Sequence, residues 1–100
     1  MSSRKLRFTS EARFDIRAIL RYGRKIWGEK RRDAYSEQLN AAIASLTRFP
    51  NLGTNRDDIS PGLRSIPVGE HVVYYRIGPH SIVIIRILHG TMDVARQFER

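Results

Sequence analysis

The apolar segment "SIVIIRILH", residues 81–89, is the feature that most constrains how this chain can fold. Side chains alternate between the two faces of an extended strand. Both faces of this one are apolar, with Ile82, Ile84 and Leu88 on one and Val83, Ile85 and Ile87 on the other. A strand of this kind needs a covering layer on each side of its sheet. We therefore predict that residues 81–89 form the central strand of a sheet.

Two shorter segments, 63–68 and 71–77, also have strand character and are separated by the dipeptide "GE". A two-residue loop with glycine first is typical of a type II′ hairpin turn. A second turn at residues 78–80 returns the chain into segment 81–89. We expect these three segments to form an antiparallel meander.

The register of this meander decides which polar side chains share a face of the sheet. The first turn places Arg64 opposite Tyr75. If the second turn pairs Ile77 with Ile82, one face carries Arg64, His71, Tyr75 and Arg86. The opposite face is then expected to carry Arg76 and His89. A slip of one residue at the second turn would move Arg86 across the sheet.

Residues 10–49 have helical periodicity, broken once at Gly28. In the first part, apolar or small residues recur at spacings of three and four, which places them on one helix face. These residues are Ala12, Ile16, Ile19, Leu20, Gly23, Ile26 and Trp27. Thr9 or Ser10 can cap the start of this helix, and Pro50 ends the second one. Two helices joined near a glycine predict an antiparallel helical hairpin.

The remaining segments complete an α+β prediction for one domain over residues 1–100. Residues 5–9 alternate and predict a short N-terminal strand, whereas the stretch 50–62, which contains Pro and Gly, predicts a loop. The tail from Met92 predicts a short terminal turn or helix. The predicted order is β-α-α-β-β-β, with the helical hairpin packed on a twisted, mainly antiparallel sheet.

The net charge of +8 is concentrated in the first third of the chain. Residues 1–32 hold 11 of the 18 Lys and Arg residues but only 3 of the 10 acids, so the rest of the chain is balanced. One side of the first predicted helix carries Arg13, Arg17, Arg21 and Arg24. Such a surplus attracts polyanions or acidic protein partners.

The composition and motifs exclude several classes of function. The chain has no cysteine, which excludes disulfides and thiolate zinc sites and permits a cytoplasmic location. It has no Gly-rich phosphate loop, no HExxH motif and no segment apolar enough to span a membrane. Its three histidines are scattered along the sequence. We therefore expect no metal and no cofactor.

Arg64 and Arg86 are the strongest candidates for chemistry. Two guanidinium groups on one sheet face can bind a phosphodiester and stabilise charge at a reacting phosphate. A proton-transfer group would also be needed, and the available residues are His71, His89 and Tyr75. The alternative is structural, because arginines on strands often pair with carboxylates or bond backbone carbonyls.

Four segments together closely resemble the ParE branch of the RelE/ParE toxin superfamily: "YGRKIWGEKRRDAY", "FPNLG", "PGLRSIPVGEHVVYYRI" and "IIRILHGTMD". The resemblance runs from about Phe8 to Asp93. It implies two antiparallel helices on a twisted sheet, and the toxin of a type II toxin–antitoxin pair. It also implies a ParD-like antitoxin partner and inhibition of DNA gyrase. RelE-like relatives instead cut messenger RNA on the ribosome.

Matching single residues to this superfamily helps to choose between the two activities. Arg64 and Arg86 match arginine positions of RelE-like nucleases, and His89 falls near the catalytic histidine of some relatives. However, His89 is followed by Gly90 and not by tyrosine, and no lysine follows Lys30. We therefore expect a gyrase inhibitor that is not an enzyme. One alternative is a metal-independent, RelE-like endoribonuclease that uses Arg64, Arg86, His89 and Tyr75. Another is a toxin-like fold that has lost toxicity and keeps only partner binding.

The resemblance and the charge pattern suggest two binding surfaces. An acidic amphipathic helix of the antitoxin is expected at the helical hairpin, where it would meet Arg13, Arg17, Arg21, Trp27 and Tyr35. The target is expected to contact Arg64, Arg76, Arg86 and His89. The two aromatic residues of the first set can also serve as core residues that wedge the helices together.

Overall fold

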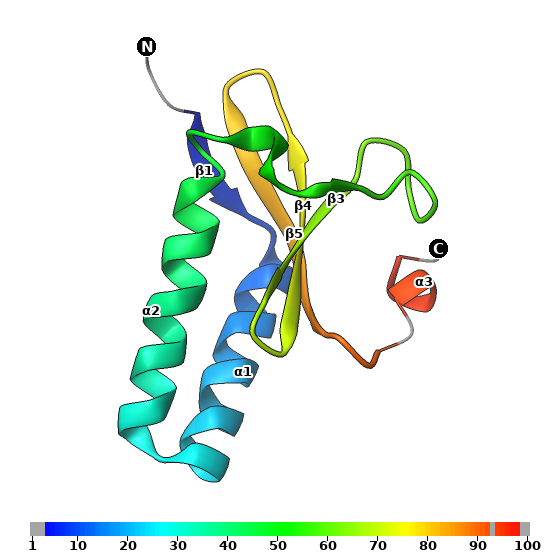
Figure 1. The fold of residues 1–100 in the computed structure, drawn as a ribbon. Helices are drawn as coiled ribbons and strands as arrows, with labels where there is room; N and C mark the ends of the chain where they lie inside the picture. Colours follow the sequence, from blue (N-terminus) through cyan, green and yellow to red (C-terminus); the bar gives the residue numbers. More distant parts are fainter. Residues whose placement is uncertain (1–3, 93, 99–100) are drawn as a thin grey trace.

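The structure is a computed structural model that describes residues 4–92 and 94–98 (Figure 1). Its elements in chain order are β1 (Lys5–Phe8), α1 (Ser10–Trp27), α2 (Glu29–Ser45), the 3-10 helix η1 (Pro50–Leu52), β2 (Thr54–Asn55), β3 (Arg64–Val68), β4 (His71–Ile77), β5 (Ser81–His89) and α3 (Val94–Gln97). The predicted α+β class and element order are confirmed, with the two-residue strand β2 added inside the expected loop.

The five strands form one mixed sheet in the order β1-β5-β4-β3-β2. Strand β1 runs parallel to β5, and the other pairs are antiparallel. The α1–α2 hairpin covers one face of the sheet, and its tip around Gly28 extends beyond the strands (Figure 1). Helix α2 ends at Ser45, four residues before the predicted end, because the chain already leaves the helical path in a turn at residues 46–48.

Apolar side chains are buried on both faces of the sheet, as the two-faced pattern of residues 81–89 predicted. The main cluster lies between the sheet and the hairpin and includes Ala12, Leu39, Ile43, Leu46, Val73, Tyr75, Ile84 and Ile87. A smaller cluster on the other face contains Leu63, Tyr74 and Leu88, packed against Ile59, Val94 and Phe98. The loop before β3 and the short helix α3 therefore provide the second covering layer.

The register of β4 against β5 differs from the prediction at one point. Tyr75 pairs with Ile84 as expected, but Ile85 is an extra residue, so that Tyr74 pairs with Arg86 and His71 pairs with His89. A β-bulge of this kind reverses the facing of every later residue. It keeps both Ile84 and Ile87 in the main cluster, while Ile85 packs on the other face.

The bulge corrects two predicted positions. Arg86 does not share the face of Arg64, His71 and Tyr75, and His89 joins His71 instead of lying opposite to it. The predicted pairing of Arg64 with Tyr75 is confirmed. The first turn also has the expected geometry, because Gly69 has a φ of 57°, which the first position of a type II′ turn requires.

Candidate functional site

Asp15, in the first half of α1, closes an open edge of β5. Strand β1 pairs with β5 only as far as Ile84. Beyond that point the backbone N–H of Ile87 donates to the Asp15 carboxylate at 2.9 Å. Arg86 donates to the same carboxylate from Nε at 2.8 Å and from Nη2 at 3.0 Å. Asp15 is only 8% exposed, so these three hydrogen bonds replace its lost hydration.

This ion pair uses two of the three guanidinium nitrogens of Arg86, and the third, Nη1, donates to Gln97 Oε1 at 3.4 Å. Its hydrogen bonds to Asp15 raise the pKa of Arg86 above the ordinary value. Two of its nitrogens bond the carboxylate in a bidentate geometry, which is the strong form of this interaction. Arg86 is therefore part of the packing of α1 on the sheet.

Arg64 and Tyr75 lie on the helix-covered face, where both bond the segment after α2. The Tyr75 hydroxyl donates to the carbonyl of Pro50 at 2.7 Å and accepts from the N–H of Gly53 at 2.9 Å. Arg64 Nη2 donates to the carbonyl of Gly53 at 2.6 Å. The hydrogen-bonding capacity of Tyr75 is thus used within the fold, and the side chain is buried.

A row of four rings connects the hairpin tip with the end of β5. Successive ring centroids are 5.3 to 5.6 Å apart along Trp27, Tyr35, His71 and His89. The Tyr35 hydroxyl donates to the carbonyl of Val68 at 2.8 Å and lies 2.6 Å from His71 Nδ1. Since the hydroxyl has one hydrogen, Nδ1 of His71 must carry a proton and donate to Tyr35.

The two histidines of this row have different surroundings. Burial, followed by the nearby His89, lowers the pKa of His71 below the ordinary value. His89 Nδ1 accepts from the backbone N–H of Thr91 at 3.2 Å, and its Nε2 lies 3.9 Å from a Glu70 carboxylate oxygen. The lowered pKa favours the neutral form of His71.

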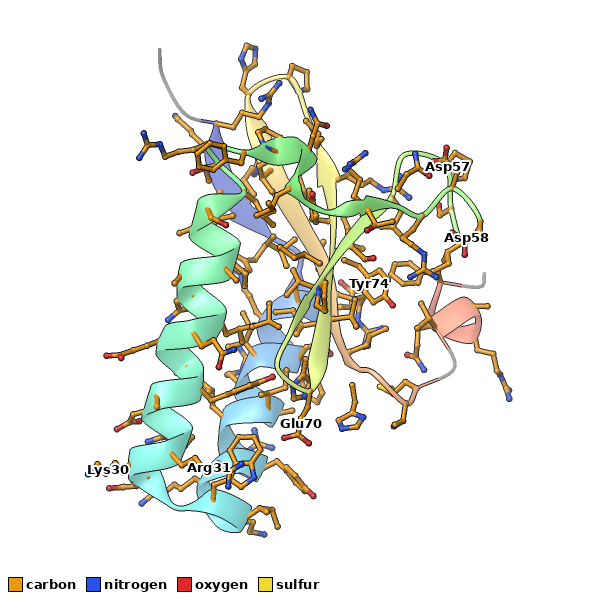
Figure 2. The ribbon with its side chains drawn as sticks, in the orientation of Figure 1. Lys30, Arg31, Asp57, Asp58, Glu70 and Tyr74 are labelled. Atoms are coloured by element: carbon orange, nitrogen blue, oxygen red, sulfur yellow. The ribbon has the colours of Figure 1, made fainter. Side chains whose placement is uncertain are left out.

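Glu70 lies at the β3–β4 turn, across from the hairpin tip that carries Arg31 (Figure 2). Both residues line an open pocket of about 310 Å³ together with Trp27, Tyr35 and Gly69. The Arg31 guanidinium lies 5.0 Å from the centroid of the Trp27 ring, at cation–π distance. A Cβ at Gly69 would lie 2.4 Å from the Tyr35 ring, so the turn and the hairpin are in close contact.

An open groove of about 270 Å³ lies between α1 and the end of β5. Apolar side chains from both elements line most of it, and its ionisable groups come from Asp15, His71, Arg86 and His89. The groove continues onto an exposed stripe of α1 that consists of Phe14, Tyr22 and Ile26, spaced at multiples of four residues. The predicted place of Ile26 on the buried face is therefore wrong, because this last turn of α1 lies beyond the sheet.

Arg76 lies on the far face and joins β4 to the loop before β3. Its Nη2 donates to Ser60 Oγ at 2.7 Å, and its Nη1 donates to the carbonyl of Pro61. Tyr74 lies on the same face, near the loop that carries Asp57 and Asp58 (Figure 2). Arg76 and Arg86 both line a cavity of about 520 Å³ beside α3.

Within residues 4–92 and 94–98, no three His, Asp or Glu side chains gather closely enough to hold a metal ion. No helix in the same part of the chain is both long and apolar enough to cross a membrane.

The match to a family model decides between the families that share this topology. The model of the ParE toxin of the type II toxin–antitoxin system parDE matches residues 6–94. The chain belongs to the ParE toxin family. Toxin ParE1 from Caulobacter vibrioides is 32% identical over 87 residues, which cover 87% of this chain and 90% of the relative.

Two solved structures share the fold of this ParE family member. A chain of the chromosomal ParDE TA system from P. aeruginosa aligns with a TM-score of 0.76 at 21% identity, over 87% of this chain and 96% of that one. A chain of the toxin–antitoxin complex RelBE2 from Mycobacterium tuberculosis aligns with a TM-score of 0.60 at 27% identity, over 88% of this chain and 99% of that one.

In this ParE fold, the predicted ribonuclease residues do not form one site. Arg64 and Tyr75 bond the segment after α2, Arg86 pairs with Asp15, and His89 contacts His71. Of these four residues, Arg86 and His89 line a common groove, and His71, which is not one of the four, lines it with them. The predicted antitoxin residues are placed at the hairpin, with Arg13, Arg17 and Arg21 exposed on α1 and Trp27 in edge-on contact with Tyr35.

Sequence reasoning missed Asp15, the residue that fixes Arg86. A signal for it was present, because position 15 follows Ala12 by three residues and precedes Ile19 by four. An acid at this spacing falls on the apolar face of the helix, where it needs a buried partner. Arg86, an arginine within an apolar strand, was the matching signal.

Proposed function

We propose that this ParE-family chain inhibits DNA gyrase and so stops replication, and that a ParD-like antitoxin neutralises it. The observation that carries the choice of gyrase over RNA cleavage is the engagement of the arginines. A nuclease of the RelE kind needs a guanidinium free to meet a phosphate beside a proton-transfer group. Here Arg86 is bound to Asp15, and Arg64 is bound to backbone carbonyls at a different place.

The exposed surface of α1 supports the proposal of an antitoxin partner. Phe14, Tyr22 and Ile26 form an apolar stripe that no other described part of the chain covers. Beside it run the exposed cations Arg13, Arg17 and Arg21. An amphipathic helix with an apolar stripe and an acidic edge complements such a surface. The solved relatives come from a ParDE system and a RelBE2 complex, which agrees with a partner of this class.

The groove beside the stripe supplies an anchor point for the same partner. It lies between Tyr22 and the end of β5, and its lining is mostly apolar. An aliphatic or aromatic side chain of the antitoxin helix would fill it and bury Met92. Both candidate targets, gyrase and the ribosome, are cytoplasmic, so the proposal places this chain in the cytoplasm.

The experiment that separates the two activities is pulse labelling of DNA and protein synthesis after induced expression in bacteria. We expect DNA synthesis to fall first, and the arrest to disappear when the cognate antitoxin is expressed from a second plasmid. An early fall in protein synthesis, with cleavage of messenger RNA, would support the RelE-like ribonuclease instead. Absence of any arrest would identify a toxin-like fold without toxicity.

A further inference from the structure

Two large apolar side chains are exposed at the end of the molecule opposite the tip of the helical hairpin. Phe49 is 59% exposed and Leu52 is 55% exposed. They flank Pro50 and Asn51 in the "FPNLG" segment that connects α2 to β2, at the upper end of the view in Figure 1. We call this pair the Phe49–Leu52 knob. It lies on a different part of the molecule from the α1 stripe.

Hydrogen bonds from side chains of β3 and β4 hold the backbone of this segment. The Tyr75 hydroxyl bonds Pro50 and Gly53, and Arg64 Nη2 bonds the carbonyls of Asn51 and Gly53. A Cβ at Gly53 would lie 2.6 Å from both the Tyr75 hydroxyl and the backbone oxygen of Ser65. The segment therefore sits directly on the sheet, with no room for a side chain at this point.

The hydrogen bonding of Arg64, one of the two residues that hold the segment, is incomplete. The Nε of Arg64 is buried without a hydrogen-bond partner among the described residues, and such a group is costly. The hydrogen bonds from Tyr75 and Arg64 restrain the backbone of the segment that carries the two apolar side chains. Binding through a rigid surface loses less conformational entropy than binding through a flexible loop. A large side chain that fills a well-packed pocket of the partner can act as an interface hot spot.

The surroundings of the knob are cationic. The Arg48 guanidinium lies 6.0 Å from the centroid of the Phe49 ring. Arg4 bonds the carbonyl of Thr47 through its backbone N–H, which places the start of β1, with the exposed Lys5, beside the turn. Residues 38–56 contain no Asp or Glu. The complementary surface is acidic and offers an apolar pocket.

We propose that the Phe49–Leu52 knob is the surface by which this chain engages its target, an acidic protein surface with an apolar pocket. The inference rests on the proposed toxic function, and it gives that function a contact site separate from the antitoxin surface. A second copy of the chain would bring a like-charged rim against this one, which disfavours self-association. Single-stranded nucleic acid is disfavoured because Phe49 is the only aromatic residue in the "FPNLG" segment, without a series on which bases stack.

The chain offers a matched pair of variants for the test. Phe49→Ser alters the knob, and Phe14→Ser alters the α1 stripe, where Phe14 is 60% exposed against 59% for Phe49. Leu52→Ser is a second knob variant. All three side chains are largely exposed, so thermal melting of each purified variant is expected to match the wild-type protein.

Growth arrest, binding to purified gyrase and binding to the antitoxin are then measured for each variant. We expect each knob variant to relieve arrest and to weaken gyrase binding about 10-fold, the effect of losing an interface anchor, with antitoxin affinity unchanged. Phe14→Ser is expected to weaken antitoxin binding and to leave growth arrest and gyrase binding unchanged. Retention of both arrest and gyrase binding by the knob variants would overturn the inference. The inference would also be overturned if the only effect of these variants were the loss of self-dimerisation or of oligonucleotide binding.

The same measurements distinguish failure of the proposed function from failure of the inference. If the wild-type chain arrests growth without binding gyrase, and the knob variants relieve that arrest, gyrase is the wrong target and the knob stands. If the wild-type chain causes no arrest and binds no gyrase, both proposals fail before the variants are compared.

Discussion

Asp15 fixes the position of Arg86, because its buried carboxylate accepts hydrogen bonds from this guanidinium and from the backbone of β5. The sequence pattern pointed to Arg86 as a possible phosphate ligand, and its role in the structure is to fasten α1 to the sheet. Tyr75 and Arg64 are similar, since their polar atoms bond the "FPNLG" segment. Residue type alone could not reveal these partners, which are distant in sequence.

Removing the charge of Asp15 tests this assignment. Asp15→Asn removes the hydrogen-bonded counter-charge of Arg86 at a largely buried site, so we expect the free energy of unfolding to fall by about 3 kcal/mol. Urea denaturation of the purified protein measures the change. In a double-mutant cycle, adding Arg86→Met is expected to cost much less than the same substitution in the wild-type chain. Additive effects of the two substitutions would contradict the assignment.

His71 predicts a dependence of stability on pH. Burial lowers the pKa of His71 in the folded protein, with His89 as the second cause, whereas Glu70 acts in the opposite direction. The unfolded chain therefore binds a proton more readily, with a pKa near 6.5. Stability is full above this value and is lost as the pH falls through it towards the folded pKa.

Urea denaturation at pH 7.5 and pH 5.5 measures the effect of His71. We expect His71→Gln to reduce the loss of stability at the lower pH. His80→Gln is the matched control, because His80 is exposed in the β4–β5 turn and has no part in the ring row. An equal loss of stability on acidification in wild type and His71→Gln would show that other groups cause it.

The helices and strands differ in how far sequence patterns could predict them. Helical periodicity placed α1 between Thr9 and Gly28, and the "GE" turn placed β3 against β4 in the observed register. The bulge at Ile85 could not be predicted, because an isoleucine satisfies either face of a strand that is covered on both sides. That single extra residue separated Arg86 from the predicted site and brought His89 to His71.

The exposed face of α1 predicts a charge-dependent affinity for the antitoxin. Reversal of charge by Arg17→Glu together with Arg21→Glu is expected to weaken antitoxin binding about 10-fold or more at low salt, mainly through slower association. The difference from wild type should shrink as salt rises. Arg48→Glu, an exposed reversal away from α1, is the control in the same binding assay. An unchanged affinity at low and moderate salt would contradict this role of α1.

In the whole molecule, the two proposed contact surfaces lie at different ends. The apolar stripe and groove of α1 face the proposed antitoxin, and the Phe49–Leu52 knob lies at the end of the sheet away from the hairpin tip. The surplus of positive charge in residues 1–32 extends from β1 along α1 and reaches both surfaces. Family membership was predictable because four sequence segments carry it, whereas the knob became visible only when exposure and its supporting hydrogen bonds were known.

The most direct test of the proposed function is DNA supercoiling by purified gyrase, measured on relaxed plasmid with the purified chain added in increasing amounts. We expect the chain to block supercoiling increasingly as its amount rises, and a prior incubation with the cognate antitoxin to restore supercoiling. Full supercoiling activity in a large excess of the folded chain would contradict gyrase as the target.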